Sequence, residues 1–322
     1  MRLPALIAFV GLVAGEARGQ CNGECARGLS LFHARRYDDA RAVLAPLAES
    51  DSASKELLFY AGRLALRARD FRSSVRLLER AVAMDAGNSV YVMWLGRAYA
   101  QDAINGNKMR LVFVARRSRN AFERAVALDP ANVQARLDLG QYYLLAPGIV
   151  GGSVEKARGQ VREIAKHDAF WGHVAAASVA RAQKDTVTAE HELRAAVAVA
   201  PDSVTGHGAL AQFLSERGRY PEAYDEVRRL MATHPEEPMP HYYMGVLAAS
   251  WKQHLDEGAA ALRRYMTLLP REEDPPLASA HYWLGAVYRA QEKADSARAE
   301  FREALRLNPQ SSRARKALEE MK

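Results

Sequence analysis

The sequence predicts an all-α protein built as a solenoid, in which similar helix pairs stack one after another. The first observation is a repeat: Pro201 and Pro235 are 34 residues apart, and Pro235 and Pro270 are 35 apart, each after a stretch with helical spacing of apolar residues. The second observation is the composition, because 49% hydrophobic and 26% charged residues exclude a disordered chain. A period of this length is typical of stacked helical repeats.

The clearest repeat lies near the C-terminus, in the sequence HYWLGAVYRAQEKADSARAEFREALRLNPQ. It has L-G-x-x-Y spacing in a first helix and A-x-x-x-F-x-x-A spacing in a second helix, followed by a proline. These positions are held by Leu284, Gly285, Tyr288, Ala297, Phe301, Ala304 and Pro309. The pattern resembles the tetratricopeptide repeat (TPR), in which small residues lie where the two helices touch and larger ones fill the seams.

The same pattern recurs along most of the chain; Gly96 and Phe122, for example, hold the glycine and phenylalanine positions of an earlier copy. The resemblance implies a TPR α-solenoid, a right-handed superhelix of about eight helix-turn-helix repeats with a C-terminal capping helix. We expect the array within 20–310 and the capping helix at 311–322. The expected repeats are approximately 22–52, 54–87, 88–131, 132–168, 169–202, 203–236, 237–272 and 277–310.

Residues 1–19 have the layout of a secretory signal peptide. Arg2 precedes an apolar run that ends at Val13, and small residues lie before Gln20. Because this run is too short to span a membrane, we expect an exported protein, periplasmic or secreted, with no transmembrane segment after signal removal. Two alternatives stay open for the two cysteines: Cys21 pairs with Cys25, or Cys21 carries a lipid anchor.

The stretch APGIVGGSVEKA, residues 146–157, is rich in glycine but lacks the lysine and the preceding strand of a phosphate-binding loop. In the repeat pattern it is a lengthened turn, in which Pro147 ends one helix and Ser153 caps the next. Together with its flanks, over residues 88–167, it resembles a group of exported bacterial TPR proteins with a similar P-G-I-V-G-G turn. That resemblance implies a scaffold of the cell envelope.

An insertion in the third repeat carries a basic patch: Lys108, Arg110, Arg116, Arg117 and Arg119. One interpretation is a docking site for acidic protein or anionic lipid, and nucleic acid is excluded by the expected export. The other, which we favour, is a longer helix with a solvated arginine face.

The first helix of each repeat lines the concave groove of a superhelix, so helical spacing predicts which residues face inward. The N-terminal half of this groove is expected to be basic and apolar, and the C-terminal half aromatic. The predicted peptide-binding residues are Phe59, Arg63, Arg67, Met93, Arg97, Gln101, Gln141, Tyr242, Tyr282 and Arg289. Arginines in this position suit carboxylates, so we expect a protein or peptide partner with acidic residues.

No catalytic motif is found in the sequence: the nine histidines form no H-E-x-x-H pair, and GGSVE is not a G-x-S-x-G turn. We therefore expect no enzyme activity, no cofactor and no metal. The predicted function is a non-enzymatic envelope scaffold that binds other proteins through its groove. The alternative is a ligand-handling periplasmic subunit, a lipoprotein if Cys21 carries the lipid, that encloses a small molecule and partners a membrane transporter.

Overall fold

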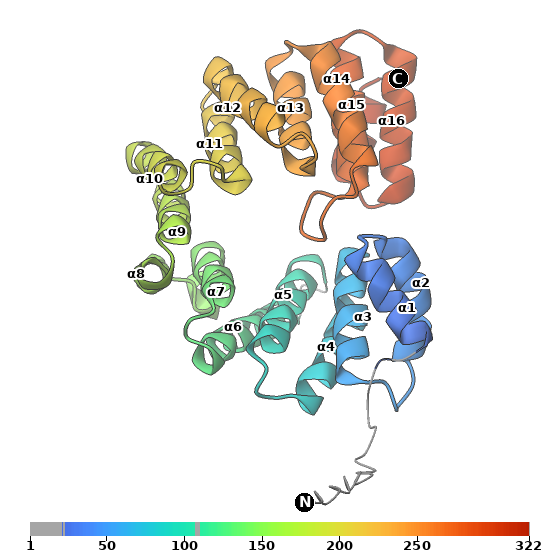
Figure 1. Ribbon diagram of the computed structural model, residues 1–322, viewed down its shortest axis with the longest axis vertical. Coiled ribbons are helices and arrows are strands. Elements are labelled where there is room, and N and C mark those ends of the chain that lie inside the picture. The colour runs from blue at the N-terminus through green and yellow to red at the C-terminus, as the bar shows by residue number, and fades with distance from the viewer. Residues whose placement is uncertain (1–20, 22, 107–109, 322) are drawn as a thin grey trace, which may run out of the picture.

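The computed structural model describes residues 21, 23–106 and 110–321, and is drawn in Figure 1. The predicted signal peptide and Lys108 lie outside the described residues. Within them the regular elements are helices joined by turns and loops, with no strand, as the sequence predicts. The helices follow one another as antiparallel pairs, and each pair packs on the next.

Eight pairs and one final helix make up the described chain. They are α1 (Glu24–His33) with α2 (Tyr37–Ala48), α3 (Lys55–Arg67) with α4 (Phe71–Met84), α5 (Ser89–Asn105) with α6 (Leu111–Leu128), α7 (Val133–Leu145) with α8 (Val154–His167), α9 (Ala169–Ala182) with α10 (Thr186–Val199), α11 (Val204–Glu216) with α12 (Tyr220–Thr233), α13 (Pro238–Trp251) with α14 (Leu255–Thr267), α15 (Leu277–Ala290) with α16 (Ala294–Leu307), and α17 (Ser312–Glu319).

Short polar residues begin many of these helices. Asn88, Asn132 and Ser203 each accept a hydrogen bond from the backbone N–H three residues further on, which satisfies a donor that the helix itself leaves free. Ser54 and Asp168 cap α3 and α9 in the same way.

Small residues let the two helices of a pair approach closely. A Cβ atom on Gly96 would lie 2.7 Å from the ring of Phe122, and one on Gly285 would lie 2.8 Å from the ring of Phe301. Both phenylalanines are buried. The predicted roles of glycine as the contact point and phenylalanine as the filler are therefore confirmed in the third and the eighth repeat.

The glycine-rich stretch forms the connection between α7 and α8, with a 3-10 turn η2 (Gly148–Val150) in its middle. Gly151 has a φ of 99°, and a Cβ atom on Gly152 would meet the carbonyl oxygen of Ala146 at 1.7 Å. The Ser153 side chain accepts a hydrogen bond from the Lys156 N–H, so it caps α8 as predicted. The turn is explained by backbone geometry.

The row of helices curves strongly, so that its two ends approach each other (Figure 1). The α14–α15 loop, residues 268–276, extends from the C-terminal end of the row toward α3 in the N-terminal end. Contacts of this loop with α3, α5 and the turn between α1 and α2 close the row into a ring. In the part of the chain that the structure describes, no helix combines the length and hydropathy needed to cross a membrane.

Candidate binding groove

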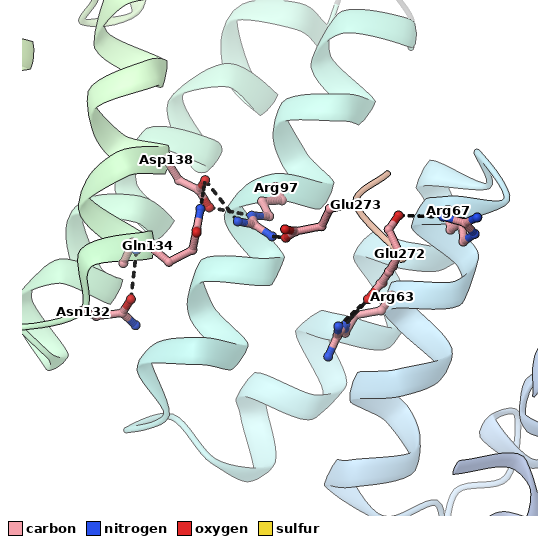
Figure 2. Close-up of polar contacts among 9 residues, drawn as sticks. Arg63, Arg67, Arg97, Asn132, Gln134, Asp138, Glu272 and Glu273 are labelled. Carbon is pink, nitrogen blue, oxygen red and sulfur yellow. Dashed lines mark hydrogen bonds and ion pairs between the residues drawn. The ribbon is translucent and has the colours of Figure 1, made fainter. Parts of the chain in front are cut away.

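Two arginines hold the same position in successive repeats, one residue after the contact glycine. Gly62 faces Leu78 of α4 and Gly96 faces Phe122 of α6, so the residue after each, Arg63 or Arg97, is rotated away from the second helix. Both arginines lie on the inner side of the ring, and Arg67 lies one turn beyond Arg63 on α3 (Figure 2). The three residues Arg63, Arg67 and Arg97 are called the arginine groove below.

Trp94 stands between the two repeats and orients both arginines. Its ring centroid lies 4.3 Å from the guanidinium carbon of Arg63 and 4.5 Å from that of Arg97. The Trp94 residue is only 8% exposed, so these cation–π contacts are shielded from water and stronger than exposed ones. The indole therefore limits the freedom of both guanidinium groups before any ligand arrives.

The arginine groove holds an acidic side chain of the same chain. The guanidinium group of Arg63 grips the carboxylate of Glu272, with Nε 3.1 Å from Oε2 and Nη2 also in contact. Arg67 donates to the carbonyl oxygen of Glu272 at 2.6 Å (Figure 2). The side chains of Arg63 and Glu272 are only 18% and 9% exposed, so this ion pair is largely removed from water.

Arg97 is shared between the loop and the wall of the groove. It donates to Oε1 of Glu273 at 2.6 Å, while its Nε and Nη2 bind the carboxylate of Asp138 on α7 at 2.5 and 3.2 Å. Burial lowers the pKa of Arg97, but the hydrogen bonds that it donates to Asp138 and the negative charge of both carboxylates more than offset this, so the pKa is raised. Arg97 therefore keeps its positive charge in the groove.

Burial is also the main influence on the pKa of two carboxyl groups of the groove, Glu272 and Asp138. It raises the pKa of Glu272 above its ordinary value, although the hydrogen bond and charge of Arg63 act in the opposite direction. It likewise raises the pKa of Asp138 against the effect of Arg97. Each buried carboxylate therefore carries a desolvation cost that its arginine does not fully offset.

The tip of the loop is a tight turn. The N–H of Asp274 donates to the Arg271 carbonyl oxygen at 3.1 Å, and the Asp274 carboxylate accepts from the Arg271 N–H at 2.6 Å. Glu272 and Glu273 are the two central residues of this turn, so adjacent carboxylates point into the groove. Arg35 after α1 also binds the loop, donating to the carbonyl oxygen of Leu269 at 3.1 Å.

The predicted groove residues fall into three groups. Arg63, Arg67 and Arg97 come together, as described. Phe59 and Met93 are buried at 5% and 4% exposure, and the Phe59 ring stacks on Tyr91 at 4.4 Å between ring centroids. They are part of the packed core beneath the groove and leave almost no side-chain surface for a ligand.

The remaining predicted residues stay apart from the arginine groove. Gln101 and Gln141 are exposed, while Arg289 forms an exposed ion pair with Glu320. Tyr242 packs on Tyr265 and Tyr282 on Phe301, with ring centroids 5.1 and 5.7 Å apart. Burial raises the pKa of Tyr242. The tyrosines of the C-terminal half thus serve the packing of the wall.

The described arginines of the basic patch bind neighbouring parts of the chain. Arg116 donates to the carbonyl oxygen of Ile149 and Arg119 to that of Val150, so both hold the η2 turn. Arg117 pairs with Glu79 at 2.6 Å and lies over the Tyr99 ring. Arg110 is exposed at the start of α6. These contacts support the interpretation as a structural face.

A cavity of about 340 Å³ continues the groove toward the middle of the array. It lies among α7, α8 and α9 and has apolar walls that include Leu137, Leu144 and Trp171. Gln141 also lines it, and Asp138 and Glu273 lie at the side of the arginine groove. The arginine groove and an apolar cavity are therefore adjacent.

Sequence reasoning missed the residues that complete the groove: Trp94, Asp138, Glu272 and Glu273. One signal for the loop is present in the sequence, where LLPREEDPP separates two repeats that otherwise follow each other closely. An acidic run between prolines in a lengthened linker has the opposite charge to the predicted groove. For Trp94, the signal is its place directly before the Leu95–Gly96 pair of the repeat.

Tetratricopeptide repeat models match the chain at residues 59–103 and 115–172, at 150–283 and at 278–311. Together they span most of the array, and the chain belongs to the tetratricopeptide repeat family. Proteins of this family are generally non-enzymatic scaffolds that bind protein or peptide partners. No curated protein matches the chain.

Two solved structures share the fold. A tetratricopeptide repeat protein from Parabacteroides merdae is 15% identical with a TM-score of 0.51, and the match covers 83% of this chain and 98% of that one. A chain of the APC/C hetero-tetramer Cut9–Hcn1 is 16% identical with a TM-score of 0.50, and the match covers 92% of this chain and 56% of that one. At these identities the similarity concerns the fold.

Proposed function

We propose that this protein is an exported, non-enzymatic scaffold of the cell envelope that binds another protein through the arginine groove. The observation that carries the proposal is the pair of aligned arginines, Arg63 and Arg97, held by Trp94 on the inner wall and engaged with adjacent carboxylates. Forked guanidinium groups bind carboxylates with two hydrogen bonds and a defined direction, so they select acidic segments.

The partner segment in this proposal presents two neighbouring acidic residues to the groove and an apolar side chain to the adjacent cavity. The cavity of about 340 Å³ has room for one or two side chains, and its walls at Leu137 and Trp171 favour apolar ones. Buried aromatic and arginine residues are the usual anchors of protein interfaces, and this groove contains both.

The test is photo-crosslinking in cells with the crosslinker at Gln141, beside the cavity, and a control crosslinker at the exposed Arg302 of α16. We expect Gln141 to capture a defined envelope protein and the R63E/R97E variant to capture at least tenfold less of it. Equal capture from Gln141 and Arg302, or from the unchanged and the charge-reversed protein, would contradict binding through the groove.

Export has its own test. We expect the mature protein in the periplasm or medium with its N-terminus near Gln20, read by mass spectrometry. An intact residue 1–19 segment on a cytoplasmic protein would contradict export. A lipid on Cys21 would support the anchored form instead.

The cavity also supports the second candidate, a subunit that encloses a small molecule for a membrane transporter. Its volume lies within the range of small-molecule sites, and apolar walls with a few polar groups are typical of them. Native mass spectrometry of the protein purified from its cells separates the two candidates. A bound small molecule that is lost in a Leu137→Trp variant favours the second, and capture of a protein partner favours the first.

A further inference from the structure

The arginine groove is already occupied by the α14–α15 loop, whose tip lies more than two hundred residues away in the sequence: Arg63 and Glu272 are 209 residues apart. Four arginines from the N-terminal half bind this loop: Arg35, Arg63, Arg67 and Arg97. They contact both carboxylates of the tip and the carbonyl oxygens of Leu269, Arg271 and Glu272. Side chains and backbone are held together, as a bound peptide would be.

We propose that this loop is an internal ligand: Glu272 and Glu273 take the place of two acidic residues of the partner, and the partner binds by displacing them. The inference rests on the proposed function. It adds that the partner segment carries two acidic residues and that the loop must leave the groove before the partner binds. The surface under the loop, formed by the arginine groove and Trp94, is then the interaction site, and a segment with two consecutive acidic residues is what it fits.

Three features of the loop suit a ligand that leaves reversibly. Its contacts with the groove are mainly charged and polar, and Glu273 is 64% exposed, so water can reach the pair that it forms with Arg97. Its own turn is closed by Arg271 and Asp274, so the loop keeps its shape when it is released. Arg271 also pairs with Glu237 of the C-terminal half at 2.7 Å, which provides a contact that survives release.

Tethering explains why such a loop blocks weak ligands. A segment held within the same chain is present at an effective concentration of the order of millimolar, so it occupies the groove most of the time even when its intrinsic affinity is modest. The apparent affinity of a free ligand is then its intrinsic affinity multiplied by the fraction of molecules in which the groove is open. If the loop is docked nine times in ten, the reduction is about tenfold.

The probe for this proposal is a fluorescent synthetic peptide with the sequence LLPREEDPPL, residues 268–277 of the chain itself. Its binding is measured by anisotropy to four full-length proteins. They are the unchanged protein, E272Q/E273Q, E272Q/E273Q/R63E/R97E, and the matched control E155Q/E163Q, which removes two exposed carboxylates of α8. Circular dichroism confirms that each protein keeps its helices.

We expect E272Q/E273Q to bind the peptide at least tenfold more tightly than the unchanged protein. The control should bind like the unchanged protein, and the added charge reversals should abolish binding. A peptide with glutamine at the two glutamate positions should bind none of the four. Because a charge-reversed variant can fail to fold, a further variant with residues 271–274 replaced by Gly-Ser-Gly-Ser gives the same comparison with an intact groove.

Two outcomes overturn the inference, and they differ in what they say of the proposed function. Equal and measurable binding to the unchanged protein, to E272Q/E273Q and to the Gly-Ser variant means that the loop does not compete, while binding through the groove stands. No binding to any variant means that the groove does not take acidic segments, which also removes the acidic preference from the proposed function.

Discussion

Helices α5 and α15 share the three letters WLG around their contact glycine, yet they present different inner faces. In α5 the next residue is Arg97, which binds Asp138 and Glu273. In α15 the corresponding residue is Ala286, and Trp283 packs against Tyr282 with ring centroids 5.2 Å apart. The shared letters build the same kind of helix pair, and the residue after the glycine decides whether the pair presents an arginine to the loop.

The comparison extends to the two halves of the ring. The N-terminal half supplies the arginines, and the C-terminal half supplies the loop that they hold. In the C-terminal half, residues such as Tyr242 and Tyr265 are spent on packing, and His207 and His281 each pair with a glutamate on the second helix of their own repeat. The N-terminal half thus presents charged side chains to the interior of the ring, and the C-terminal half uses its aromatic side chains for packing.

The largest expected effect is that of Trp94→Ala. Truncation of this buried indole removes core packing and both cation–π contacts, and we expect a loss of about 3–5 kcal/mol in the free energy of unfolding. It should also free the loop, seen as faster cleavage by a glutamyl endopeptidase after Glu272 and Glu273.

Trp283→Ala is the matched control, because this tryptophan holds the same repeat position and is only partly buried. We expect a smaller loss of stability and unchanged cleavage of the loop. If both variants expose the loop equally, Trp94 has no special role in orienting the arginines.

The next effect in size is that of Arg97→Gln. It leaves the largely buried carboxylate of Asp138 without a charged partner, which we expect to cost about 3 kcal/mol in urea unfolding. Arg289→Gln serves as the comparison in the C-terminal half, because its pair with Glu320 is exposed and worth at most about 1 kcal/mol. Equal losses from the two variants would contradict the difference between the halves.

Much of this architecture could be predicted from the sequence, because it depends on contacts within one or two repeats. The approach of Gly96 to Phe122, the cap at Ser153 and the inward direction of Arg63 and Arg97 all follow from helical spacing. Contacts across the ring could not be predicted this way. They depend on the small rotation between successive repeats, which is added up over the whole array before Glu272 reaches Arg63.

Phe59 was expected to line the groove, but it is buried. Helical spacing placed Phe59 on the inner face, but it does not say how tightly neighbouring first helices pack. Tyr91 of α5 covers the Phe59 ring, and the residue becomes part of the floor. Spacing gives the direction of a side chain, and the curvature of the array decides whether that direction leads to solvent.

The smallest expected effect is that of pH on the docked loop. Burial raises the pKa of Glu272 in the docked loop above the pKa that it has in the released loop. At a pH between these two pKa values, docking is therefore accompanied by the uptake of a proton. This contribution therefore favours docking at low pH and is lost as the pH rises through the raised pKa.

Carboxyl NMR of Glu272 measures this directly. We expect a pKa above the ordinary glutamate value in the unchanged protein and a return toward that value in Arg63→Glu/Arg97→Glu, where the loop is released. An ordinary pKa for Glu272 in the unchanged protein would mean that its carboxylate is not buried in the groove.

The central claim is that the two ends of the array are joined through Arg63 and Glu272, and a double-mutant cycle tests it most directly. Urea unfolding of the unchanged protein, Arg63→Ala, Glu272→Ala and the double variant gives the coupling energy of the pair. We predict a favourable coupling of at least about 1 kcal/mol, as for residues in one ion pair. Strictly additive effects, with a coupling near zero, would contradict the closed ring and with it the internal ligand.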